Sequence, residues 1–133
     1  MASIRREARI KTQPEAAWAA LRDVGALHTR LARGFVSDTR LEAGARIVTF
    51  ANGMVVRELI VDVDESARRV AWSARTDGLS HHSASAQVLP DGPSACRFVW
   101  IADLLPDEAA PVIAAMIDQG MAAIQETLEK DAS

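Results

Sequence analysis

The last long stretch of the chain, from Pro106 to Lys130, constrains the fold most strongly. Its apolar residues recur every three or four positions, which predicts one long helix with a single buried face. These residues are Ile113, Met116, Ile117, Met121, Ile124 and Leu128. Such a helix spans roughly 30 Å, about the width of a small domain. Because the chain before it has strand-like patterns, we expect the helix to lie across a β-sheet.

Gly120 lies in the middle of that apolar face, next to Met121. A glycine inside a helix costs about 1 kcal/mol relative to alanine, so its presence needs a reason. One interpretation is close packing of the helix on the sheet. The other is a helix held off the sheet above a cavity, bordered by flexible methionines. The periodicity of the sequence is compatible with both interpretations.

The chain between Phe35 and Leu104 is typical of successive β-strands separated by turn residues. The predicted strands are Phe35–Leu41, Ala45–Phe50, Val55–Val63, Arg69–Thr76, His81–Leu89 and Cys96–Leu104. The connections between them are short and contain pairs such as Asn52-Gly53 and Asp77-Gly78. Short connections favour an antiparallel meander.

The N-terminal part adds one strand and two short helices. Apolar Ile4, Ala8 and Ile10 alternate with charged residues, which predicts a strand with one solvated face. Arg6 falls on the apolar side, and we expect it to reach water at the open end of the strand. Thr12 and Glu15 have the spacing of a capping box, with Pro14 in the first helical turn.

A second short helix is expected over Ala26–Ala32. The elements together predict an α+β fold, in which a seven-stranded antiparallel sheet wraps its concave face around the C-terminal helix.

The composition excludes several classes of protein. The chain has 133 residues, which suits one domain over 1–133, and a net charge of −3, which does not favour nucleic acid or an anionic membrane. The single cysteine, Cys96, excludes an internal disulfide. No apolar run approaches the roughly 20 residues of a membrane span, and no signal peptide is apparent. We therefore expect a soluble, cytoplasmic domain.

Two adjacent histidines, His81 and His82, are the nearest approach to a metal-binding motif. Neighbouring positions on a strand point to opposite faces, so the pair does not predict a metal site. His82 shares its side with Ala84, Ala86 and Val88 and is expected to face inward. It is either a hydrogen-bonded core residue or a general acid or base.

Glu58 is the second titratable candidate. It follows Arg57 in the strongly apolar strand Val55–Val63, so one of the two charges faces each side of the sheet. The strand pattern does not decide which, and by itself it favours a surface ion pair. A buried carboxylate would need a partner, for which Arg46 on the neighbouring strand is suited.

Trp72 and Trp100 lie on apolar rows whose inward neighbours are small. These neighbours are Ala74, Ala84, Ala86 and Ala102. Small residues across adjacent strands leave volume that protein interiors do not normally keep empty. The pattern favours a pocket for an apolar molecule.

Several segments, in this order and spacing, resemble the START-related lipid-binding superfamily (SRPBCC), in particular its polyketide cyclase/dehydrase branch. They are PEAAWAALRD, GARIVTF, VVRELIVDVDESARRVAWSA, CRFVWIADLLPD and the long final helix. The resemblance implies the helix-grip fold, with a cavity between the curved sheet and the helix. It also implies that Glu58 points into that cavity and that Trp72 and His82 line it. The chain has no tyrosine, so it lacks the phenols with which many similar proteins orient ligands.

The leading hypothesis is a protein that binds a small hydrophobic or amphipathic molecule, such as a lipid, polyketide or aromatic metabolite, without a cofactor or metal. The predicted ligand-binding residues are Arg46, Phe50, Glu58, Trp72, His82, Trp100, Met116, Ile117, Gly120 and Met121. The alternative is a cyclase- or dehydratase-type enzyme that uses Glu58 and His82 as acid and base. A third class is an interaction module, and edge strands make a homodimer possible.

Overall fold

The computed structural model describes all 133 residues, and its elements follow the expected order. The strands are β1 (Ala2–Ile10), β2 (Val36–Glu42), β3 (Ala45–Phe50), β4 (Val55–Asp64), β5 (Arg69–Arg75), β6 (His81–Pro90) and β7 (Cys96–Leu105). The helices are α1 (Pro14–Arg22), a π-helical turn η1 (Leu27–Leu31), a 3₁₀ turn η2 (Asp107–Ala109) and α2 (Ala110–Ala132).

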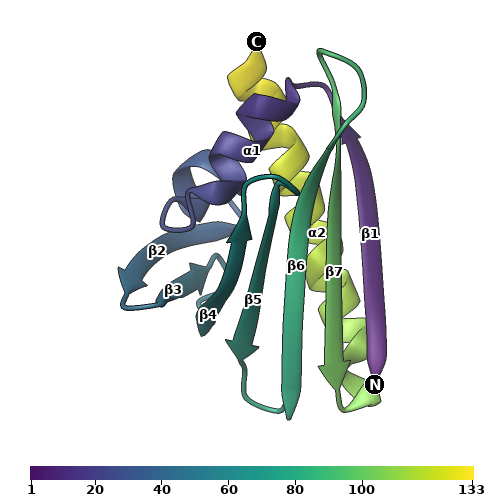
Figure 1. Cartoon of the computed structure of the whole chain (residues 1–133). Coiled ribbons are helices and arrows are strands. Elements are labelled where there is room, and N and C mark those ends of the chain that lie inside the picture. The colour runs from purple at the N-terminus through teal and green to yellow at the C-terminus, as the bar shows by residue number, and fades with distance from the viewer.

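The seven strands form one antiparallel sheet in the order β1-β7-β6-β5-β4-β3-β2. Figure 1 shows this sheet curving around α2, which crosses its concave side, while α1 and η1 close one end. Register shifts in β2 at Val36/Asp38 and in β4 at Ile60/Asp62 add local twist to the strands that curl over the helix. The α+β helix-grip architecture is confirmed.

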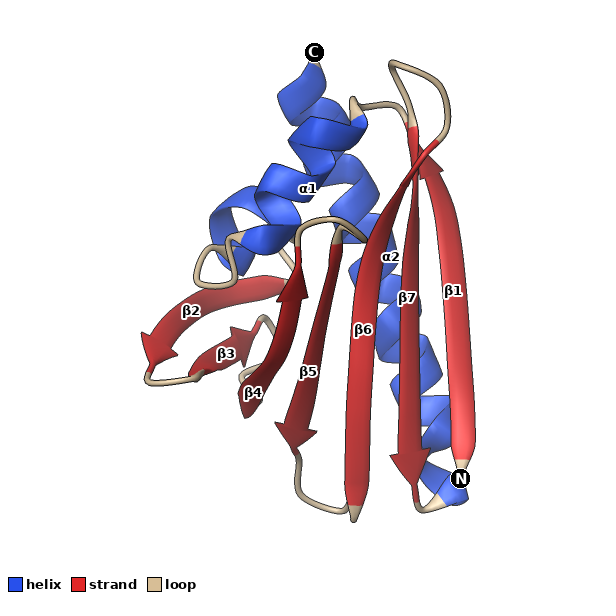
Figure 2. Ribbon diagram, viewed as in Figure 1, coloured by secondary structure: helices blue, strands red, loops and turns tan.

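The core lies between the concave face and α2 (Figure 2). Ile10, Val70, Val88, Phe98 and Leu104 are fully buried on that face. The helix contributes residues of the predicted apolar stripe, Ile113, Ile117, Met121, Ile124 and Leu128, all of them buried. None of the helices combines the length and the hydropathy that a membrane crossing requires.

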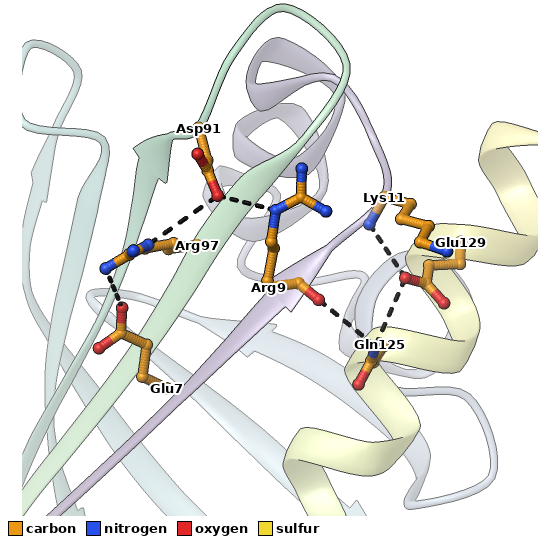
Figure 3. Close-up of polar contacts among 7 residues, drawn as sticks. All are labelled: Glu7, Arg9, Lys11, Asp91, Arg97, Gln125 and Glu129. Carbon is orange, nitrogen blue, oxygen red and sulfur yellow. Dashed lines mark hydrogen bonds and ion pairs between the residues drawn. The ribbon is translucent and has the colours of Figure 1, made fainter.

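Polar contacts anchor α2 along β1. The Nε of Arg6 donates to Asp118 Oδ1 on α2 at 2.7 Å, so this arginine is ion-paired rather than simply extended into water. Near the other end of the helix, the backbone N–H of Lys11 donates to Glu129 Oε2 at 2.9 Å (Figure 3). This bond lowers the pKa of Glu129. Gln125 adds a bond to the carbonyl of Arg9 at 3.4 Å.

A second set of contacts in Figure 3 joins β1 to the β6–β7 hairpin. Asp91 accepts a bond from Arg9 Nε at 2.8 Å and lies 4.0 Å from Arg97 Nε. Arg97 in turn donates to Glu7 at 3.1 Å. These pairs join strands that are distant in sequence. Glu7 and Arg9 are exposed and alternate along β1 with the inward-facing Ala8 and Ile10, so the pairs lie on the face of the sheet away from α2.

Two sequence predictions about helix ends are wrong in detail. The capping box of Thr12 and Glu15 does not form: Pro14 occupies the first helical position, Gln13 becomes the N-cap residue without a side-chain bond, and Thr12 is buried. The long helix begins at Ala110 rather than near Pro106, because the 3₁₀ turn precedes it. Pro111 lies in the first turn of the helix, as predicted.

Candidate ligand-binding cavity

Two small cavities lie between the concave face of the sheet and the helices that cover it. We call the first the His82 cavity. Its lining includes Glu58, Ala74 and His82 from the sheet, and Ile113, Met116 and Ile117 from the first half of α2. The second, the Arg46 cavity, lies closer to η1 and the second half of α2. Its lining includes Arg46 and Val48 from β3, Leu27 and Leu31 from η1, Phe35, and Ile124 from α2.

The two cavities adjoin, because four residues line both of them. These are Phe50, Glu58, Trp72 and Trp100. The volumes are about 50 Å³ and about 60 Å³. Each has room for only a few water molecules, whereas small-molecule sites typically measure about 300–1,000 Å³. A ligand of ordinary size therefore requires the shared side chains to move apart.

A buried ion pair belongs to the wall between the cavities. Arg46 and Glu58 are opposite each other on β3 and β4, and Arg46 Nε donates to Glu58 Oε1 at 2.8 Å. The two side chains are only 3 % and 10 % exposed. The guanidinium also lies 5.1 Å from the ring centre of Trp72, a cation–π arrangement.

This geometry decides between Arg57 and Glu58. Glu58 faces inward, whereas Arg57 faces outward and pairs with Glu42 at 3.3 Å. The surface position that the strand pattern favoured for Glu58 is wrong. The inward position is stable because Arg46 on the adjacent strand supplies the counter-charge that a buried carboxylate needs. Glu58 Oε1 accepts the bond from Arg46.

Two buried polar atoms at the His82 cavity have no hydrogen-bond partner. They are Nδ1 of His82 and Nε1 of Trp100. Buried polar groups in native proteins are nearly always paired with protein, water or ligand. An indole N–H can only donate, so Trp100 requires an acceptor. These two atoms give a largely apolar site two buried polar groups without a partner in the chain.

The pKa of His82 lies below its ordinary value of 6.5, which favours the neutral imidazole. Burial lowers the pKa of its imidazole, and the nearby charge of His81 lowers it further. A neutral imidazole offers one donor and one acceptor nitrogen, which suits either ligand binding or proton transfer. No group of three or more His, Cys, Asp and Glu side chains is arranged to hold a metal ion.

The lowered pKa of His82 predicts acid destabilisation that begins near neutral pH. As the pH falls below 6.5, the unfolded state takes up a proton that the folded state resists, so the free energy of unfolding decreases. Carboxylates such as Glu129, whose pKa is lowered from 4.5, reduce the stability mainly from about pH 5 downward. Urea unfolding between pH 7 and 5 should therefore show a slope that His82→Gln removes.

The control for that slope is His81→Gln, which removes an exposed histidine from the adjacent position. We expect this variant to keep most of the pH dependence. Equal slopes for the wild type and His82→Gln would contradict the assignment, whatever the absolute stability of the variants.

Gly120 and Met121 line neither cavity, contrary to the sequence prediction. A Cβ at Gly120 would lie 2.7 Å from Cζ3 of Trp100 and 3.1 Å from Cε2 of Phe35. The glycine therefore makes room for the Trp100 ring, whose bulk fills the space that a cavity would occupy there. Met121 is buried in the packed core. The helix is close-packed at Gly120, but against a side chain rather than against a strand backbone.

The remaining predicted residues lie at the cavities. Phe50, Glu58, Trp72 and Trp100 border both, Arg46 borders one, and His82, Met116 and Ile117 border the other.

Sequence reasoning missed several further lining residues. They are Leu27, Leu31, Met54, Thr76, Ile113 and Ile124. The spacing of four between Leu27 and Leu31 could have indicated an inward helical face. Nothing in the sequence signals the inward position of Met54, which follows a turn.

Comparison with solved structures shows the same fold in proteins of low sequence identity. An uncharacterised protein from Bacillus thuringiensis aligns with a TM-score of 0.85 at 15 % identity, over 96 % of this chain and 98 % of its own. A START superfamily protein from Mycobacterium smegmatis aligns at 0.73 and 11 % identity, over 98 % and 96 %. Norcoclaurine synthase from Thalictrum flavum, in complex with dopamine and hydroxybenzaldehyde, aligns at 0.71 and 18 % identity, over 97 % and 84 %.

No protein of curated function matches the sequence significantly. A family model does match, over residues 1–129, and its description is polyketide cyclase / dehydrase and lipid transport. The chain belongs to this polyketide cyclase / dehydrase and lipid transport family.

Proposed function

We propose that the protein binds a small amphipathic molecule in the two adjoining cavities between the sheet and α2. One observation carries the proposal: an apolar site whose walls hold a buried ion pair also contains buried polar atoms without partners. Empty space and unpaired polar groups both cost stability. A bound molecule would fill the empty space and form hydrogen bonds with the unpaired polar groups.

The polar groups define what the ligand must offer. Trp100 Nε1 requires an acceptor, and the Glu58 carboxylate, which accepts a bond from Arg46, can accept a further bond from a donor on the ligand. A hydroxyl, phenol or enolised carbonyl on an apolar body provides such groups. Burial of the body contributes about 25 cal/mol per Å² of apolar surface. Norcoclaurine synthase, of the same fold, holds dopamine and hydroxybenzaldehyde, which are aromatic molecules with hydroxyl groups. A polyketide or aromatic metabolite fits this description best.

Native mass spectrometry of the purified protein, followed by a thermal-shift screen of hydroxylated aromatic and lipophilic compounds, tests the proposal. We expect a co-purified ligand or a compound that raises Tm. Ala74→Leu, which fills the His82 cavity, should abolish that shift. Ala71→Leu, a matched change on the same strand but outside both cavities, should preserve it. Failure to find any ligand, or equal responses of the two variants, would argue against binding at this site.

A second candidate function, an aldol-type cyclase or dehydratase, is favoured by the placement of His82 and Glu58. Glu58 is opposite Ala74, and the Ser73–Ser83 pair places His82 on the far side of Ala74. Because β5 and β6 are no longer paired at this level, the backbones of the two candidates are at least two strand spacings apart, that is, at least roughly 10 Å, and Ala74 lies between them. A bound poly-carbonyl chain can reach both.

In such a reaction, neutral His82 would remove a proton from a carbon between two carbonyls. The resulting enolate carbon would attack a second carbonyl, and the imidazolium would return the proton to the new alkoxide. For the dehydration, Glu58 would take the remaining proton from that carbon and, as the carboxylic acid, give it to the departing hydroxyl, which leaves as water; His82 stays neutral in this step. Turnover that survives both Glu58→Gln and His82→Gln would remove this role and leave binding alone.

A further inference from the structure

The sheet is split at one end between β5 and β6. Pairing between these strands ends at Ser73–Ser83, although β5 continues to Arg75 and β6 begins at His81. Each strand stays paired on its other side, β5 with β4 as far as Arg75 and β6 with β7 from His81 onward. Figure 2 shows the two strands diverging toward the loop that joins them.

A polar pocket of about 500 Å³ lies at this split, and we call it the hairpin mouth. Arg75, Asp77, Ser80 and His81 contribute to its lining. Three more of its residues, Ala74, Thr76 and His82, also line the His82 cavity. The boundary between the His82 cavity and the hairpin mouth therefore consists of the small side chains of Ala74 and Thr76 and the imidazole of His82.

A competing opening exists on the helix side. A groove of about 110 Å³ involves Ala51, Asn52 and Gln119 and shares Phe50 and Met116 with the His82 cavity. Its boundary with the cavity thus consists of a phenylalanine and a methionine, which are larger than Ala74 and Thr76. The smaller side chains make the split between β5 and β6 the more open route.

The charges in the mouth indicate which head group it accepts. Arg75 and Asp77 line it, and neither forms an ion pair or side-chain hydrogen bond in the protein. Arg75 follows Ala74 on β5 and is directly opposite Arg57 on β4. Arg57 is already paired with Glu42. Arg75 is therefore the cation left available at the entrance.

We infer that ligands enter the His82 cavity through the split between β5 and β6, and that the hairpin mouth holds an anionic head group against Arg75. The ligand class is then an amphiphile with a carboxylate at one end and an aromatic or short apolar body that enters the cavity. This inference rests on the proposed function, and it specifies the charge of the ligand's head group and which end of the ligand enters the cavity.

An equilibrium experiment tests the head group. The probes are 2-naphthoate and 2-naphthalenemethanol, which share a ring and differ in charge, with tryptophan quenching as the readout. We expect 2-naphthoate to bind more tightly, and Arg75→Gln to weaken it by about 2- to 5-fold, the range of a partly exposed ion pair. The alcohol should be unaffected. Asp77→Asn should tighten 2-naphthoate, since it removes a negative charge.

Arg57→Gln is the matched control, because it removes the same charge from the adjacent strand position outside the mouth. Its affinity for 2-naphthoate should stay within error of the wild type. Equal effects of Arg75→Gln and Arg57→Gln, or no preference for the anion, would overturn the inference while leaving the proposed function in place. Failure of the wild type to bind either probe would count against the proposed function itself.

A kinetic experiment tests the route. Thr76→Trp at the split should slow both association and dissociation of 2-naphthoate by about 10-fold or more in stopped flow, because it narrows the path. Gln119→Trp, at the helix-side groove, should leave both rates unchanged. Slower exchange in Gln119→Trp, or unchanged exchange in Thr76→Trp, would show that the ligand uses another path.

Discussion

Replacing Arg46 with methionine should lower the free energy of unfolding by about 3–5 kcal/mol, measured by urea denaturation. The change keeps an apolar stem of similar length but leaves the buried Glu58, whose side chain is 10 % exposed, without its partner at 2.8 Å. An unpaired buried carboxylate is far more costly than the loss of the attraction itself. The variant also loses the cation–π contact with Trp72.

Two controls test whether the loss of stability comes from leaving a buried charge unpaired or simply from breaking an ion pair. Arg57→Met breaks the exposed pair with Glu42, whose side chains are both 43 % exposed, and should cost less than about 1 kcal/mol. The double variant Arg46→Met with Glu58→Met removes both charges and should regain much of the lost stability. Similar losses for Arg46→Met and Arg57→Met would mean that the Glu58 carboxylate is not isolated from water.

The second large effect is expected for Trp100→Ala, which should cost about 3–5 kcal/mol and widen the range of ligands. The Trp100 ring lies 6.2 Å from that of Trp72, packs over Gly120 and borders both cavities. Its removal joins the two cavities into one space. Denaturation gives the stability, and a homologous series of naphthyl and longer aromatic ligands, read by thermal shift, gives the size limit.

Trp18→Ala is the matched control for this experiment. Trp18 is buried in α1 and donates to Glu65 at 2.7 Å, but it borders neither cavity. It should lose stability to a comparable extent without admitting larger ligands. If both variants admitted larger ligands to the same extent, the effect would come from general loosening of the fold rather than from loss of the Trp100 ring between the two cavities. Should Trp100→Ala not fold, Trp100→Phe keeps most of the packing and still removes the indole N–H.

The predicted effects share a physical origin. A chain that only had to be stable would fill these cavities and replace the buried ion pair with apolar side chains, since such replacements are often neutral or stabilising. This chain instead keeps Ala74 and Ala86 beneath the helices and a charged pair between the cavities. The cost in stability is typical of sites arranged for binding.

Local patterns in the sequence were sufficient for much of the fold. Alternation along β1 and β6 correctly placed Ile10 and Val88 in the core, and it placed His82 on the same side. The three-to-four spacing of the last stretch predicted α2 and its buried face. These features follow from side-chain periodicity within one element, which a sequence displays directly.

Features that depend on contacts between elements were not decided by the sequence. Whether Arg57 or Glu58 faced inward depended on Arg46, which is opposite Glu58 on another strand. The role of Gly120 depended on the position of the Trp100 ring, twenty residues earlier in the chain. The Thr12 cap failed because Pro14 took the first helical position and Thr12 was buried.

By itself, then, the sequence determined the order of the elements, their buried faces and the α+β architecture, because each depends on the periodicity of neighbouring residues. Only the tertiary structure decided the size and division of the cavities, the inward carboxylate and the split between β5 and β6. Those properties depend on distances between side chains from different strands and from α2. Such distances are set by how the sheet curves around the helix, and no single stretch of the chain encodes them.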